Sequence, residues 1–126
     1  FDRLTAVREL AHATNCIVVL KGARTLICDG REAREGYASL DVLVNMTGNP
    51  GMASGGTGDV LAGLIGGFIA QGCDVFDATK LAVWVHGQCG DVAADLVGQH
   101  SLTANALVDA LPSVLKEIAS PAALFI

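Results

Sequence analysis

The chain contains 126 residues, carries a formal net charge of −5, and is 52% hydrophobic but only 17% charged. This length and apolar content suffice for a packed core and exclude an intrinsically disordered chain, so we expect a single globular domain. The acidic balance would repel a nucleic-acid backbone, so we expect no nucleic-acid partner.

Three other features bear on the compartment and on the ends of the chain. The most apolar stretch, residues 60–70, is too short to span a bilayer, so we expect no membrane partner. The four cysteines lie among aliphatic residues without Cys-x-x-Cys pairs or zinc spacing, which indicates buried reduced thiols and a cytoplasmic protein. The chain begins at Phe1, in what looks like the middle of a helix, so we expect a preceding segment, which would also contain any targeting signal.

The first part of the chain predicts one helix and several short strands. Apolar residues at helical spacing predict a helix over residues 4–15, and the apolar run at residues 16–20 predicts a buried strand. Residues 25–30 predict a strand that enters a hairpin turn at its Asp-Gly end, with the charged residues 31–35 as the solvated return. Residues 41–45 predict one more short strand.

The second part predicts three helices. Residues 57–71 carry apolar side chains on nearly all sides, which predicts a central, buried helix. The next helix opens at Asp74 or Asp77, both of which are good N-terminal residues. The last covers about residues 103–118, and we expect Pro112 to interrupt it.

This order of elements predicts the α/β fold class, with short sheet strands followed by packed helices. It is typical of the second half of an α/β domain, so residues 1–126 are predicted to form a single partial domain. A parallel sheet requires helices on both faces. We therefore expect an uncovered edge or face unless further residues or another subunit cover it.

A glycine-dense loop at residues 45–56 leads to one carboxylate, Asp59, at the start of a helix. Glycines let the backbone approach a ligand, and the first amides of a helix lack intrahelical partners, so this junction can hold phosphate beside a base for phosphoryl transfer. A Walker A loop is excluded because no lysine lies between Lys21 and Lys80, and Leu61 stands where a Rossmann fingerprint needs its third glycine. The structural alternative is a plain glycine-rich connection with a helix-capping Asp.

Several segments in a fixed order carry a family resemblance. The most specific reads Asn-Met-Thr-Gly-Asn-Pro-Gly-Met-Ala-Ser-Gly-Gly-Thr-Gly-Asp, of which Gly-Thr-Gly-Asp alone would mark only a broad superfamily. The segments are residues 19–25, 45–59, 82–87, 90–94 and 111–112. Together they resemble the C-terminal part of the ADP/ATP-dependent NAD(P)H-hydrate dehydratases, within the ribokinase-like superfamily. The resemblance implies the C-terminal portion of a ribokinase-like fold, its nucleotide-binding and catalytic half.

The resemblance also implies a reaction. Such lyases repair hydrated NADH or NADPH by phosphorylating the hydroxyl on C6 of the ring, after which elimination of phosphate restores the double bond. Asp59 is then the catalytic base that binds the substrate hydroxyl and accepts its proton. The amides of Gly56, Thr57 and Gly58 form an anion hole for the moving phosphoryl group. The chain alone need not be active.

Nucleotide binding is assigned by the resemblance to the segment after the first strand, together with one loop glycine. Lys21 would neutralise phosphate there, although a Lys-Gly turn is also commonly a solvated turn. Asn45 and Asn49 are secondary candidates for orienting phosphate or a metal-bound water, and both also fit ordinary turn chemistry. The nucleotide-binding residues are Lys21, Gly22, Ala23, Arg24, Thr25 and Gly58.

Four residues of the helix predicted after Asp74 give weaker indications of a functional role. His86 is interpreted as packing or hydrogen bonding at a helix contact, and Trp84 as a core residue rather than an adenine-stacking one. Asp91 and Asp95 share a helical face but lack a third ligand, so we interpret both as solvated. No direct metal ligand is predicted.

The predicted cofactor is Mg²⁺, with ATP or ADP as co-substrate. The predicted partners are NADHX or NADPHX, further copies of the chain in a homo-oligomer, and an NAD(P)HX epimerase domain or protein. Two rival functions stay open: a ribokinase-like small-molecule kinase of the thiamine-precursor type, which would stop after phosphorylation, and a non-catalytic nucleotide-binding fragment.

Overall fold

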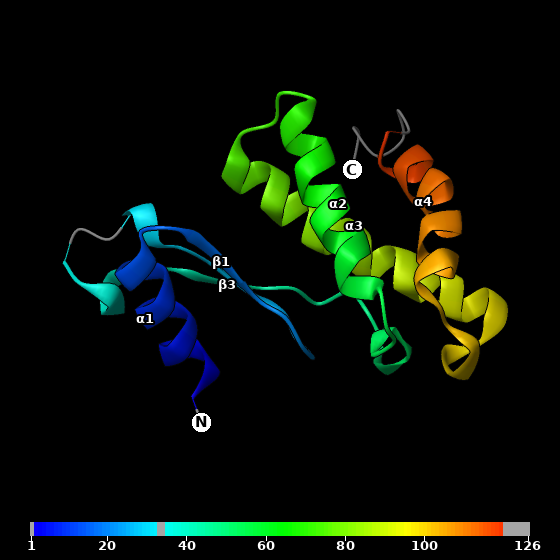
Figure 1. Ribbon diagram of the computed structural model, residues 1–126, viewed down its shortest axis with the longest axis horizontal. Helices are drawn as coiled ribbons and strands as arrows, with labels where there is room; N and C mark the ends of the chain where they lie inside the picture. Colours follow the sequence, from blue (N-terminus) through cyan, green and yellow to red (C-terminus); the bar gives the residue numbers. More distant parts are fainter. Residues whose placement is uncertain (1, 33–34, 120–126) are drawn as a thin grey trace. The chain divides into compact units, whose positions relative to one another are not determined.

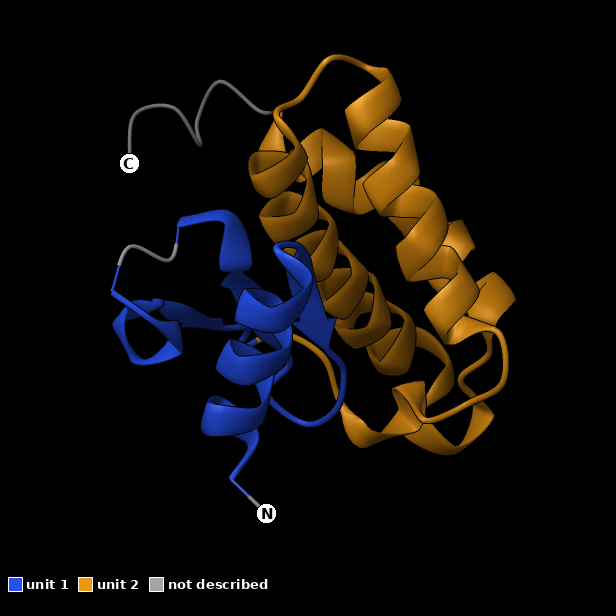
Figure 2. Cartoon of the chain, turned by 60° about the vertical axis from the view of Figure 1, so that its left-hand side comes forward, with its two compact units in different colours: residues 1–46 blue, residues 47–126 orange. Residues whose placement is uncertain are grey.

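The computed structural model describes residues 2–32 and 35–119, and the chain forms two compact units (Figure 1; Figure 2). Unit 1 comprises Phe1–Met46 and unit 2 comprises Thr47–Ile126. Each unit has an apolar core of its own. Short strands followed by packed helices confirm the predicted α/β class, while the assignment of residues 1–126 to a single domain stays a prediction. Among the helices described, none is both long and apolar enough to cross a bilayer.

Unit 1 is a three-stranded antiparallel sheet with one helix packed on it (Figure 1). The strand order is β1-β2-β3, and β2 is central. The core of the unit joins apolar residues of the helix and the sheet, including Val7, Ala11 and Cys28. In chain order the elements are α1 (Arg3–Thr14), β1 (Ile17–Leu20), β2 (Leu26–Asp29), η1 (Gly30–Glu32), η2 (Tyr37–Ser39) and β3 (Val42–Val44).

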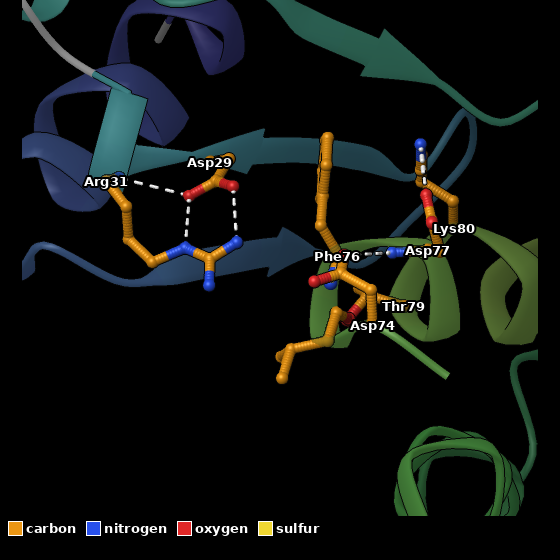
Figure 3. Close-up of polar contacts among 8 residues, drawn as sticks. Asp29, Arg31, Asp74, Phe76, Asp77, Thr79 and Lys80 are labelled. Atoms are coloured by element: carbon orange, nitrogen blue, oxygen red, sulfur yellow. Dashed lines mark hydrogen bonds and ion pairs between the residues drawn. The ribbon is translucent and has the colours of Figure 1, made fainter. Parts of the chain in front are cut away.

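The helix and the three strands of unit 1 are predicted correctly, but the hairpin is not. The predicted turn after Asp29 is wrong, because the hairpin joins β1 to β2 through residues 21–25. The Asp29 carboxylate instead accepts hydrogen bonds from the backbone N–H of Arg31, at 3.0 Å, and from its guanidinium, at 2.9 and 2.7 Å (Figure 3). This local pairing turns the chain into η1 rather than into a return strand. Residues 33–34 of the predicted return lie outside the described residues.

Burial in unit 1 also differs from the prediction. Of the run at residues 16–20, β1 itself is only half-buried, because it lies at the edge of the sheet, and Cys16 before it is exposed, whereas all of β2 is buried. A parallel arrangement is not formed by these three strands. Between β1 and β2 the short connection over residues 21–25 favours antiparallel pairing, since a parallel pair needs a crossover of about a dozen residues or more.

Over residues 47–119, unit 2 is a bundle of three helices, with two 3-10 turns in its connections (Figure 2). Its core joins residues of α3 and α4, such as Val85, Cys89 and Leu107, with partly buried residues of α2 packed against them. In chain order the elements are η3 (Pro50–Met52), α2 (Thr57–Ala70), α3 (Val75–Val97), η4 (Gln99–Ser101) and α4 (Ala104–Ile118).

The boundaries of the three helices agree with the prediction, but their burial does not. In α2 only Thr57 and Leu61 are buried, so the expectation of a central α2 is wrong, and α3 takes that place. Asp74 opens α3 by accepting the N–H groups of Phe76 and Asp77 at 3.0 and 3.2 Å (Figure 3).

The expected interruption of the last helix is also wrong, since α4 continues through Pro112. Proline removes the hydrogen bond to the carbonyl of Val108, one turn earlier. Val108 is 49% exposed, so this side of the helix faces solvent and not the core. The helix therefore tolerates the proline without breaking.

All four cysteines are free thiols, as predicted, but only two of them are buried. Cys28 and Cys89 lie in the cores of units 1 and 2, whereas Cys16 and Cys73 are exposed. Burial raises the pKa of the Cys89 thiol to about 11. The prediction that every cysteine is buried is thus wrong for the two that lie at the ends of helices.

Candidate active site

The glycine-rich loop enters α2 through a backbone shape that few residues adopt. Gly56 precedes the helix with φ of 91°, in the left-handed region, and makes no side-chain cap. Thr57, the first helical residue, is buried and donates its hydroxyl hydrogen toward the carbonyls of Met52 and Ser54, at 2.9 and 3.0 Å. The side chain of Thr57 therefore ties the helix start to the end of the loop, and the helix begins where the sequence predicts.

Unpartnered main-chain donors gather at this helix start. Within the described ranges, the N–H groups of Gly55, Gly56 and Gly58 donate no hydrogen bond, whereas the Thr57 N–H points to the Ser54 carbonyl at 3.4 Å. Donors of this kind, at the positive end of a helix dipole, attract anions. Of the predicted anion hole, Gly56 and Gly58 thus have amides that are open to a ligand, and the Thr57 amide is engaged within the chain.

Asp59 lies in the first turn of α2, directly after these donors, and its side chain is exposed. Its backbone N–H donates to the Gly56 carbonyl at 3.1 Å. Its carboxylate makes no hydrogen bond or ion pair with any residue that the structure describes. Asp59 therefore makes no side-chain cap, and the N-cap position belongs to Gly56, so the alternative of a plain loop with an Asp that favours the helix dipole stays open.

His86 of α3 supports the same helix start. Its Nε2 lies 2.7 Å from the Thr57 carbonyl oxygen, and because a carbonyl can only accept, Nε2 carries the hydrogen of this bond. The interpretation of His86 as a hydrogen-bonding residue at a helix contact is confirmed. Trp84, interpreted as core, is 41% exposed, so that interpretation is wrong.

The loop before η3 lies against one face of α3. Thr47 donates its hydroxyl hydrogen to the Trp84 carbonyl at 3.0 Å, and the N–H of Gly48 donates to Asp91 Oδ2 at 2.9 Å. The close approach requires a small residue at position 87 of α3, because a Cβ there would overlap Thr47, including its backbone; one turn further along, a Cβ on Gly90 would meet the flexible side chain of Met52.

Asn49 completes this contact with both polar ends of its side chain. Its amide nitrogen donates to Asp91 Oδ1 at 2.9 Å, and its carbonyl oxygen accepts the N–H of Gly51 at 3.0 Å. A phosphate contact by Asn49 stays a prediction. The interpretation of Asp91 as solvated is wrong, since two loop donors meet its carboxylate, whereas Asp95 is exposed as expected. The signal missed in the sequence is that Gly87, Gly90 and Asp91 share one helical face.

The predicted nucleotide-binding segment lies in unit 1, as the turn between β1 and β2. Lys21 is exposed, and Arg24 adopts a left-handed φ of 57°. The guanidinium of Arg3 donates to the Ala23 carbonyl at 2.7 Å, and the hydroxyl of Thr25 donates to the Gly22 carbonyl at 3.1 Å. The turn is therefore held in one shape, and Arg3 is a residue that sequence reasoning missed.

The predicted site residues thus fall into two groups. In unit 1, the N–H of Asn45 donates to the Thr25 carbonyl at 2.8 Å, which brings Asn45 beside the nucleotide-binding turn. In unit 2, one continuous network joins Asn49 to the helix start that carries Asp59. Over residues 2–32 and 35–119, no three His, Cys, Asp or Glu side chains gather in a way that could hold a metal ion.

Comparisons with known proteins point to one family. The sequence profile described as NAD(P)H-hydrate dehydratase matches residues 1–113. The chain belongs to the NAD(P)H-hydrate dehydratase family. The family resemblance predicted from the sequence is thereby confirmed.

Individual relatives support the same family. The bifunctional NAD(P)H-hydrate repair enzyme of Vibrio cholerae is 43% identical over 114 residues, which cover 90% of this chain and 21% of that protein. The ADP-dependent (S)-NAD(P)H-hydrate dehydratase of Neisseria meningitidis is 39% identical over 97 residues, 77% of this chain and 30% of that protein. The chain therefore spans well under half the length of these curated relatives.

A solved structure of the family gives the same fold. The ADP/ATP-dependent NAD(P)H-hydrate dehydratase from Bacillus subtilis, co-crystallized with ATP/Mg²⁺, matches with a TM-score of 0.81 and 36% sequence identity. The match covers 92% of this chain and 39% of that one. This likeness confirms the ribokinase-like fold class expected from the sequence.

Proposed function

We propose that this chain provides the catalytic centre of an NAD(P)H-hydrate dehydratase, a lyase that repairs hydrated nicotinamide nucleotides. The observation that carries the proposal is the exposed Asp59 carboxylate, which has no partner among the described residues and lies in the first turn of α2, directly after the open amides of Gly56 and Gly58. A base beside an anion-binding helix start is what transfer of a phosphoryl group to an alcohol requires.

In the proposed reaction, Asp59 accepts the proton of the ring hydroxyl as the hydroxyl oxygen attacks the terminal phosphorus of the nucleotide. The bond from that phosphorus to the bridging oxygen breaks, and the open amides of Gly56 and Gly58 stabilise the charge on the moving phosphoryl group. Loss of phosphate from C6, with loss of a proton from the neighbouring carbon, then restores the double bond. Phosphoryl transfer of this kind depends mainly on how the reacting groups are positioned.

The nucleotide is ATP or ADP in this proposal, and the β1–β2 turn contacts it. Lys21 contributes a cation, and Gly22 and Ala23 contribute a main chain that a phosphate can approach. The B. subtilis structure was co-crystallized with ATP/Mg²⁺. Among the described residues no three His, Cys, Asp or Glu side chains gather as metal ligands, and no step here is routed through Mg²⁺. Oligomerisation and an epimerase domain or partner remain predictions.

The test is an Asp59→Asn variant of the full-length protein that carries this sequence. Asparagine keeps the shape of the side chain but cannot accept the proton, and a general base contributes about 100- to 10,000-fold to rate. We expect nucleotide-dependent recovery of NADH from its hydrate, followed by absorbance, to fall by this factor. Nucleotide affinity, measured by calorimetry, should stay within a few-fold of the parent value.

Asp109→Asn is the matched control, since Asp109 is an exposed carboxylate on α4 and is expected to leave turnover unchanged. Unchanged turnover in Asp59→Asn would refute the assigned base. A parent protein that phosphorylates a thiamine precursor and leaves NADH hydrate untouched would establish the kinase alternative. Binding of nucleotide without any turnover of the hydrate would establish the non-catalytic one.

A further inference from the structure

The approach loop, defined as residues 47–56, is held at both ends by α3. At its beginning, Thr47 donates to the Trp84 carbonyl. At its far end, His86 donates to the Thr57 carbonyl, two residues before Asp59. One rigid helix therefore sets where the glycine-rich segment starts and where the catalytic helix α2 begins.

The polar centre of this attachment is the Asp91 carboxylate. One of its oxygens accepts the N–H of Gly48 and the other accepts the side-chain amide of Asn49, both at 2.9 Å. Hydrogen bonds to an ionised acceptor are about twice as strong as neutral ones. These contacts join residues 42 and 43 positions apart in the chain, so they fix tertiary rather than local structure.

From Asp91 the network continues to the helix start. The Asn49 carbonyl oxygen accepts the N–H of Gly51 and so fixes η3, whose last residue, Met52, accepts the hydroxyl hydrogen of Thr57. Three hydrogen bonds and the peptide bond between Gly51 and Met52 thus join Asp91 to Thr57, all within unit 2. A displacement of the Asp91 contact would therefore move the amides and the carboxylate that the proposed reaction uses.

We propose that Asp91 is a positioning residue for the reaction. It orients the approach loop through Gly48 and Asn49 and so places the Asp59 carboxylate beside the open amides, without contacting substrate itself. The proposal rests on the proposed function for its kinetic consequence. Its structural part, the Asp91–Asn49 pair, does not depend on which reaction the site performs.

The pair offers a sharp test because its two side chains have the same shape and opposite hydrogen-bonding roles. In Asp91→Asn, an amide hydrogen must face either the Gly48 N–H or the Asn49 amide, so two donors meet. In Asn49→Asp, two carboxylates meet.

The double swap combines Asn49→Asp with Asp91→Asn. The new carboxylate at position 49 accepts from the Gly51 N–H and from the new side-chain amide at position 91. The oxygen of that amide accepts from the Gly48 N–H. Every donor again has an acceptor, and the net charge equals that of the parent.

The three variants are made in the full-length protein and compared with the parent. A misplacement of about 1 Å can cost about 100-fold in rate, so we expect each single variant to lose about 10- to 100-fold in kcat, with KM for the nucleotide within a few-fold. The double swap should recover kcat to within a few-fold of the parent. Asp95→Asn, one turn further along α3 and exposed, is the matched control and should equal the parent.

Hydrogen exchange of the approach loop, measured by mass spectrometry, separates this inference from the proposed function. We expect faster exchange in the loop peptide in both single variants and parent-like exchange in the swap, whatever reaction the protein catalyses. A parent protein without dehydratase activity would refute the proposed function and would leave the structural role of Asp91 to be tested by hydrogen exchange. The positioning role would be overturned if Asp91→Asn kept the kcat and the exchange rate of the parent. It would also be overturned if the kcat of the double swap were no higher than that of the worse single variant.

Discussion

Gly87 of α3 is a position where the approach loop leaves no room for an added methyl group. A Cβ there would overlap the Thr47 hydroxyl and would lie only 2.7 Å from the Thr47 carbonyl carbon, which is backbone. Relief therefore requires the approach loop to move away from α3. The Gly87→Ala variant is expected to strain the loop and to break the hydrogen bond from the Thr47 hydroxyl to Trp84.

The free energy of this change follows from three contributions. Overpacking against backbone costs up to about 3 kcal/mol, and the lost hydrogen bond costs about 1 kcal/mol more. Alanine in place of glycine inside a helix returns about 1 kcal/mol. We therefore expect Gly87→Ala to lower the free energy of unfolding by about 3 kcal/mol, the upper end of these ranges.

Gly90→Ala is the matched control, because Gly90 lies on the same helix and gains the same propensity. The three atoms nearest to its added Cβ all belong to the Met52 side chain, which is unbranched and can rotate away. An overpacking cost of about 1 kcal/mol and an equal propensity gain leave stability nearly unchanged.

Urea denaturation followed by circular dichroism compares the two variants with the parent in the full-length protein. Gly87→Ala should unfold at clearly lower urea concentration, while Gly90→Ala should stay close to the parent. Equal midpoints for Gly87→Ala and the parent, or a larger loss in Gly90→Ala, would refute the close approach of the loop to α3.

Two further predictions follow from cysteine exposure and from the ion pair of unit 1. Iodoacetamide should modify the exposed Cys16 and Cys73 and leave native Cys89 unmodified, because burial raises the pKa of the Cys89 thiol to about 11. Mass spectrometry of the peptides measures which cysteines are modified. Rapid labelling of Cys89 would contradict its place in the buried core. The hydrogen bond from Arg31 lowers the pKa of Asp29 in the folded protein below its ordinary value of 3.8. The Asp29–Arg31 pair therefore stabilises the fold above pH 3.8, and this stabilisation is lost as the pH falls through the lowered pKa. Asp29→Asn should therefore cost about 1 kcal/mol at neutral pH and nothing in strong acid; a loss that is equal at both pH values would exclude the ionic origin.

Local interactions explain which parts of the fold are predictable. The start of α3 at Asp74 and the start of α2 at Thr57 follow from caps and from glycine, which act within a few residues. The predicted hairpin is misplaced because the pairing of Asp29 with Arg31 competes with the turn that an Asp-Gly sequence favours. The local sequence does not indicate whether the chain forms the Asp-Gly turn or the Asp29–Arg31 pair.

The sequence by itself determined the α/β class, the dehydratase family and the position of Asp59 in the first turn of a helix, since motif spacing and helical periodicity are properties of neighbouring residues. Only the tertiary structure decided that α3 is the central helix and that Asp91 receives the approach loop. The physical reason is separation along the chain: the partners of Asp91 lie 42 and 43 residues away, and packing alone brings them together.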